Sequence, residues 1–116
     1  MFHDIFVAAV KESRRAEYLE HAGTVAAVFR AHGALSYIEN WGVDLMQGER
    51  TSFPKAVELE AGEAVVVGWA VWPDQAARDG AMPGIMPDPA MQAGMKALPI
   101  DGTRMIFGGF ETVLER

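Results

Sequence analysis

The sequence predicts one α+β domain spanning residues 1–116, with two helical regions on one face of an antiparallel sheet. Apolar runs typical of strands alternate along the chain with segments of helical periodicity. Their order is strand, helix, strand, strand, helix, strand, which is the split β-α-β pattern of a ferredoxin-like fold with a four-stranded sheet. The main strands are apolar on both of their faces, so each face of the sheet needs a cover.

The first part of the chain predicts two strands joined by a helix. Residues 3–10 form an apolar run, and Ser13 can cap the helix that follows. In that helix apolar side chains recur at three- and four-residue steps, which gives one buried stripe. The stripe consists of Tyr18, Ala22, Val25, Ala26 and Phe29. Gly33 is expected to end the helix, and residues 34–45 are expected to form the second strand.

The middle of the chain predicts two more strands. Residues 54–60 carry charged alternate side chains, which predicts a short extra strand at the edge of the sheet. Residues 65–72, Val-Val-Val-Gly-Trp-Ala-Val-Trp, are the most β-prone run and predict the third main strand.

The remaining residues predict a second helical region and a last strand. Asp74 is expected to cap a helix, and the Pro-Gly pair at 83–84 is expected to break or end it. The Asp-Pro pair at 88–89 then starts a short helix. After the Asp-Gly turn at 101–102, the chain to residue 114 predicts the last strand, which we expect to lie centrally beside the first.

The second apolar face of the sheet predicts a partner. Helices cover one face only, so the other face would expose a large apolar surface to water. A second copy of the chain is the simplest cover, and we therefore expect a homodimer in which two sheets face each other.

The overall charge excludes some classes of partner. The formal net charge is −6, whereas nucleic acids and anionic membrane surfaces require a basic patch. We therefore expect no nucleic-acid and no membrane partner. The chain has no cysteine, so it has no disulfide and no thiolate site. Its start lacks a secretory signal pattern, and we expect a cytoplasmic protein.

Two mid-strand carboxylates are the candidate catalytic residues, Glu39 and Glu111. Each lies on a strand face otherwise rich in aromatic residues or methionine. A carboxylate in an apolar cavity has a raised pKa and can act as a general base near neutral pH. The competing interpretation is that Glu111 forms an ion pair with Arg104 or lies in water.

Large apolar side chains provide candidate ligand-binding residues. Trp41, Trp69, Met105 and Phe107 can line a pocket for a planar molecule. The alternative is that they form the core and the dimer interface. Methionines between residues 82 and 95 can form a flexible pocket wall or ordinary core.

The sequence contains no convincing metal or cofactor motif. His21 and His32 are eleven residues apart, about three helical turns, so they cannot share a metal ion. No P-loop, nucleophile elbow or dinucleotide fingerprint is present. The Gly-Gly pair at 108–109 has no helix after it and instead predicts a bulge or the close approach of another chain or a ligand. We expect neither a metal nor a cofactor.

Four segments resemble the YbaA-like family of small bacterial proteins, whose function is not known. They are His32–Leu35, Thr51–Pro54, Asp88–Met91 and, most specific, Asp101–Phe110. The resemblance runs over nearly the whole chain and is weakest at residues 73–87. It implies a ferredoxin-like protomer of the dimeric α/β-barrel superfamily, which also includes cofactor-free monooxygenases.

These observations predict a homodimer that binds a small apolar or aromatic molecule in a cleft. Two alternatives stay open: a cofactor-free monooxygenase- or isomerase-like enzyme, and a protein–protein interaction module with no small-molecule site. A cavity that holds a buried carboxylate would favour an enzyme, whereas an exposed or ion-paired Glu111 would count against Glu111 as its base.

Overall fold

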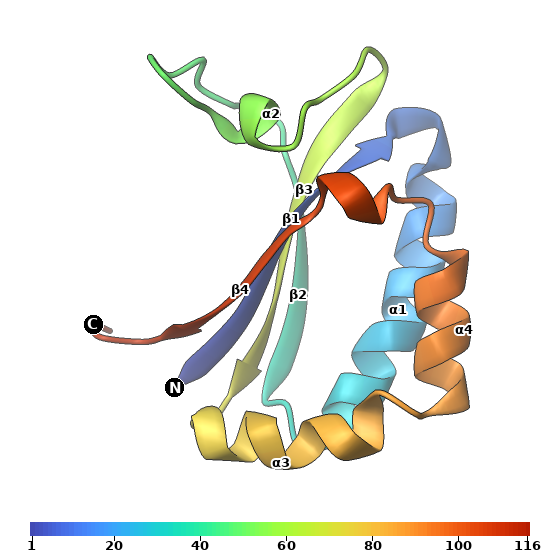
Figure 1. The fold of residues 1–116 in the computed structure, drawn as a ribbon, viewed down its shortest axis with the longest axis vertical. Coiled ribbons are helices and arrows are strands. Elements are labelled where there is room, and N and C mark those ends of the chain that lie inside the picture. Colours follow the sequence, from blue (N-terminus) through green and yellow to red (C-terminus); the bar gives the residue numbers. More distant parts are fainter.

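The computed structural model describes residues 1–116 and consists of one antiparallel sheet with helices on one side (Figure 1). The strands are β1 (Phe2–Lys11), β2 (Ser36–Trp41), β3 (Glu63–Trp72) and β4 (Ile106–Glu111). The helices are α1 (Arg15–Ala31), α2 (Phe53–Ala56), α3 (Gln75–Ile85) and α4 (Pro89–Ala97). Short 3-10 turns precede α1 at Glu12–Arg14 and β4 at Gly102–Arg104. The predicted α+β, ferredoxin-like architecture is confirmed.

The strand order is β2-β3-β1-β4, and every neighbouring pair is antiparallel. The prediction that the last strand is central is wrong, because β4 pairs only with β1 and forms an edge of the sheet. The two ten-residue strands, β1 and β3, occupy the centre and pair along their whole length. Phe107 and Phe110 of β4 are largely exposed as a result.

The predicted extra strand at residues 54–60 is wrong, since this region begins with the short helix α2. The Ser52 hydroxyl accepts a hydrogen bond from the Lys55 amide at 3.1 Å, and Pro54 lies in the first turn, where its missing N–H is harmless. This local cap outweighs the alternating charges on which the strand prediction rested.

One helix prediction also needs correction, because Ser13 lies in the 3-10 turn and forms no cap of α1. Helix α3 starts at the predicted Asp74 cap, whose Oδ1 accepts from the Ala77 amide at 2.8 Å. It includes Pro83 and ends at Ile85, directly after the Pro-Gly pair that was expected to break or end it. Ile85 in its last turn is fully buried, so tertiary packing stabilises the turn despite the proline. The predicted start of α4 at Asp88 is confirmed by its bond to the Ala90 amide at 2.8 Å.

The main core lies between the sheet and the helices. Phe2, Ala70 and Trp72 of the sheet pack against α1 and the two C-terminal helices. The buried residues of α1 are Tyr18, Ala22, Val25, Val28 and Phe29. This stripe matches the predicted one except that Val28 takes the place of Ala26, which is only half-buried. Side chains along each strand point alternately toward the helices and toward the other side of the sheet. We call that other side of the sheet the open face.

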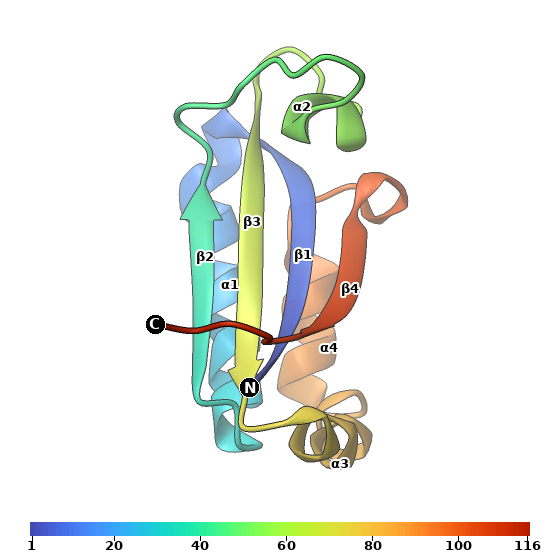
Figure 2. The ribbon, with the colours of Figure 1, turned by 90° about the vertical axis from the view of Figure 1, so that its left-hand side faces the viewer.

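The open face carries no helix over most of its area, as Figure 2 shows with α1 and α4 lying behind the sheet. Ile38, Ile106 and Phe110 are exposed on it. Only one end is covered, where Val57 packs on Ala9 and Val65. None of the helices has the length and hydropathy needed to cross a membrane.

Candidate functional site

A cavity of about 240 Å³ lies between the helix-facing side of the sheet and the helices α1, α3 and α4. Thirteen of the 15 residues around it are hydrophobic. Helix α4 packs against α1, where Gly94 allows the two helices to approach closely at Val25. Because α4 rests on α1 and not on the strands below it, space remains above β1 and β4.

One row of residues across the sheet forms the floor of the cavity. The strand registers place Glu39 of β2, Gly68 of β3, Phe6 of β1 and Phe107 of β4 side by side. Gly68 is needed in this row, because a Cβ there would lie 2.4 Å from Cε1 of Phe6 and 2.9 Å from Oε2 of Glu39. The glycine therefore creates the room in which the ring and the carboxylate lie.

Methionines form much of the opposite wall. The cavity is lined by Met82 of α3, Met86 directly after α3, Met91 and Met95 of α4, and Met105 before β4. Met86 and Met95 are 57% and 40% exposed, and Phe107 across from them is 63% exposed. These three side chains mark the mouth. Unbranched, polarisable side chains can adjust to ligands of different outline.

Glu39 is the distinctive polar group of the cavity. Its Oε2 accepts a hydrogen bond of 2.9 Å from the Tyr18 hydroxyl, and no protein group bonds to its Oε1. No lysine, arginine or histidine lines the cavity. Burial raises the pKa of Glu39 to about 7, against the lowering effect of the Tyr18 bond. Glu39 can therefore hold or release a proton near neutral pH.

A second carboxylate, Asp4, lies on the cavity wall and is 5% exposed. Its Oδ2 accepts from the Trp72 indole N–H at 3.0 Å, and its Oδ1 lies 3.3 Å from Nη1 of Arg78. Burial raises the pKa of Asp4, while Arg78 opposes the shift. Gly109 makes room for this arrangement, because a Cβ there would lie 2.5 Å from the Phe2 ring and 3.3 Å from Arg78. The groups that approach Gly109 are side chains of the same chain, whereas the glycine pair predicted a bulge or the approach of another chain or a ligand.

The structure divides the predicted site residues among three places. Glu39, Met105 and Phe107 all line the cavity. Trp41 lies next to it, with its ring centroid 6.4 Å from that of Tyr18. Trp69 of the open face and Glu111 at the end of β4 border a shallow hollow away from the cavity. Glu111 is exposed and forms no ion pair.

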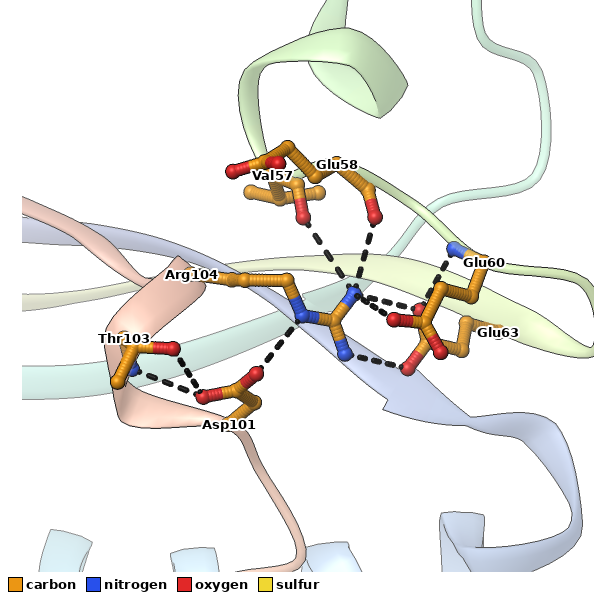
Figure 3. A network of polar contacts seen from close by, with 7 residues as sticks. All are labelled: Val57, Glu58, Glu60, Glu63, Asp101, Thr103 and Arg104. Atoms are coloured by element: carbon orange, nitrogen blue, oxygen red, sulfur yellow. Dashed lines mark hydrogen bonds and ion pairs between the residues drawn. The ribbon is translucent and has the colours of Figure 1, made fainter.

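Arg104, the expected alternative partner of Glu111, is used elsewhere (Figure 3). It binds Glu63 through two bonds of 2.8 Å and Asp101 through one of 3.0 Å, and it also donates to the Glu58 carbonyl. These bonds tie the start of β4 to the start of β3 and lower the pKa of Glu63 to about 2. The network holds the fold together and lies outside the cavity.

Three polar residues of the cavity were not predicted as site residues: Asp4, Tyr18 and Tyr37. Asp4 gave the same signal as Glu39, a carboxylate in the middle of an apolar strand. Tyr18 was interpreted only as part of the helix stripe. Tyr37 shares a face of β2 with Glu39, two residues away. No group of three or more histidine, aspartate or glutamate side chains is arranged to hold a metal ion.

Comparisons with known proteins place the chain in a family and a fold. Residues 1–102 match the family described as "Protein of unknown function (DUF1428)". The chain is 39% identical over 112 residues to the uncharacterized protein YbaA of Escherichia coli K12, covering 97% of this chain and 96% of YbaA. The resemblance to the YbaA-like family is confirmed.

Two solved structures show the fold alone, because their identities are low. One is a dimeric ferredoxin-like protein from an uncultured marine organism, with a TM-score of 0.66, 11% identity, and coverage of 99% and 97% of the two chains. The other is a mutant of SnoaB, a cofactor-independent oxygenase of Streptomyces nogalater, with a TM-score of 0.60, 14% identity, and coverage of 98% and 95%.

Proposed function

The chain belongs to the DUF1428 family, and we propose that it binds a small apolar or aromatic molecule in the cavity between its sheet and its helices. The observation that carries this proposal is an apolar cavity that contains a carboxylate without a cation beside it, Glu39, whose second oxygen has no hydrogen-bond partner in the protein. Ligand sites typically combine apolar walls with a few placed polar groups.

The cavity volume limits the ligand to a small molecule. An apolar cavity of about 150 Å³ is enough for benzene, and sites for drug-sized ligands begin at about 300 Å³. At about 240 Å³, this cavity suits one or two aromatic rings or an aliphatic molecule of similar size. Adjustable methionines at its mouth give such a molecule a way in.

Glu39 favours a second candidate function, proton-transfer catalysis without a cofactor. A carboxylate with a pKa of about 7 can take a proton from one carbon of a bound molecule and return it to another, which is an isomerisation. Glu39 would be the base and Tyr18 the group that orients it. The exposed position of Glu111 argues against that residue as the base.

We also propose that a second copy of the chain covers the open face. Exposed apolar side chains on this face, among them Ile38 and Phe110, support a homodimer. The dimeric ferredoxin-like protein with the same fold supports it as well. In this arrangement Trp69 contributes to the interface and not to a ligand site. The alternative of a pure interaction module would use this face and leave the cavity empty.

A thermal-shift screen of small aromatic and aliphatic compounds tests the binding proposal, because a ligand that binds the folded state raises the melting temperature. The wild type, Glu39→Gln and Glu111→Gln are compared. We expect some compounds to raise the melting temperature of the wild type, and we expect the size of this increase to differ in Glu39→Gln but not in Glu111→Gln. Failure of every one- and two-ring compound to raise the melting temperature contradicts the proposal.

A further inference from the structure

Two polar groups that line the cavity from one face of β2 have no hydrogen-bond partner within the protein. They are Glu39 Oε1 and the Tyr37 hydroxyl, neither of which forms a hydrogen bond within the protein, whereas Glu39 Oε2 is occupied by Tyr18. Tyr37 and Glu39 are two residues apart on one face of β2, so their side chains leave the strand side by side. The Tyr37 ring is fixed edge-on against Phe29, with centroids 5.3 Å apart.

The two groups need complementary partners. An ionised carboxylate oxygen only accepts hydrogen bonds, while a phenol can donate one. Tyr37 and Glu39 are half-buried, and a bound ligand would remove water from both groups. A polar group that loses its water without gaining a partner is unfavourable, so the best ligand group accepts from Tyr37 and donates to Glu39. A hydroxyl does both. A carboxylate on the ligand would face Glu39 with no basic side chain in the lining to neutralise it.

The position of these groups also sets the orientation of the ligand. Glu39 lies at the β2 side of the floor and is covered by Tyr18 of α1. The mouth, at Phe107, lies three strands away, roughly 14 Å across the sheet at about 4.8 Å per strand. The polar end of a ligand therefore lies innermost, and its apolar body extends over Phe6 toward the methionines.

We propose that the cavity is specific for a one- or two-ring aromatic molecule with a hydroxyl group, which donates to Glu39 Oε1 and accepts from the Tyr37 hydroxyl. Anionic analogues of the same shape are excluded. This inference rests on the proposed binding function, and the experiment is designed so that the two can fail separately.

The test compares three compounds that share one ring system: 2-naphthol, naphthalene and 2-naphthoate. Dissociation constants are measured by isothermal titration calorimetry at about pH 8, where Glu39 with its pKa of about 7 is mainly ionised. We expect 2-naphthol to bind roughly tenfold more tightly than naphthalene, and 2-naphthoate at least roughly tenfold more weakly.

Three variants assign the effect to the two groups. Tyr37→Phe should weaken 2-naphthol binding roughly threefold to tenfold and leave naphthalene binding unchanged. Glu39→Gln should reduce the ratio of the dissociation constants of 2-naphthoate and 2-naphthol by at least about tenfold. Glu111→Gln, a matched loss of one exposed carboxylate, should preserve the wild-type order.

The outcomes separate the two proposals. Equal binding of 2-naphthol and naphthalene, or tighter binding of 2-naphthoate, overturns the hydroxyl specificity and leaves the binding function standing. Absence of binding by all three compounds contradicts both. If Glu39→Gln does not fold, judged by circular dichroism, the wild-type series and Tyr37→Phe decide the question alone.

Discussion

Replacing Glu39 with glutamine should stabilise the folded protein at pH 8 and leave its stability almost unchanged at acidic pH. The wild-type carboxylate is buried without a cation, and its only protein partner is the Tyr18 hydroxyl. Glutamine has nearly the same shape and can still accept from Tyr18. The substitution therefore removes the charge and little else.

The magnitude follows from the pKa of Glu39, which burial raises from 4.5 to about 7. Between these values the folded protein binds more protons than the unfolded chain, so the contribution of Glu39 to the free energy of unfolding falls as the pH rises. Each tenfold change in proton affinity is worth about 1.36 kcal/mol. The stability of Glu39→Gln relative to wild type should thus increase by up to about 3 kcal/mol between pH 4.5 and pH 7, and then level off.

Urea unfolding of wild type, Glu39→Gln and Glu111→Gln at a series of pH values measures this difference. Asp4, Tyr18 and Tyr37 are present in all three proteins, so their contributions to the pH dependence of the free energy of unfolding cancel when the variants are compared. A relative stability of Glu39→Gln that stays constant, or that falls with pH, would refute the claim that Glu39 is buried without a counter-charge. Glu111→Gln controls for the loss of one carboxylate at an exposed site.

Three further predictions concern the fold and the assembly. Arg104→Gln should lower the melting temperature, measured by circular dichroism. The loss should be largest above about pH 4.5, where Glu63 is ionised in both the folded and the unfolded protein, and smaller toward pH 2, the approximate pKa of Glu63 in the fold. An equal loss at every pH contradicts this account. Trp69→Glu should convert a homodimer to a monomer in light scattering, and a wild-type monomer at micromolar concentration would disprove the dimer. Gly68→Ala should destabilise by about 1–3 kcal/mol in urea unfolding, because its Cβ overlaps the Phe6 ring. Gly23→Ala, where a Cβ meets nothing within 4 Å, is the matched control, and equal effects of the two would argue against a crowded cavity floor.

Local signals in the sequence predicted the parts of the fold that local chemistry decides. Asp74 caps α3 as expected, and α4 starts at the Asp-Pro pair as expected, where Asp88 also accepts a bond from a free amide. A carboxylate next to free amide groups needs no tertiary context to form such a cap. Helix α3 ends at Ile85, directly after the Pro-Gly pair that was expected to break or end it, and burial of Ile85 stabilises the last turn beyond the proline. The central place expected for β4 failed because strand order is a property of the whole sheet and not of one segment.

The site could be predicted only in part for a similar reason. Glu39 was identifiable as a carboxylate inside an apolar strand, and Phe107 as an aromatic residue of the last strand. Which face of each strand meets the helices is decided by packing, so Trp69 could not be separated from the cavity residues by sequence. Glu111 shares a face of β4 with Phe107, but it lies at the end of the strand, beyond the cavity. The bond from Tyr18 depends on how one turn of α1 lies over β2, which residue spacing does not reveal.

The unpaired Glu39 is the strongest argument for a small-molecule site over a pure interaction module. A protein whose role is limited to its open face has no use for a carboxylate on the opposite side of the sheet. At neutral pH and above, the ionised group lowers stability by up to about 3 kcal/mol relative to a neutral side chain of the same size. Gly68 in addition keeps open the space in which that carboxylate lies. A ligand that donates a hydrogen bond to Glu39 would offset this loss, and an empty interaction module would not.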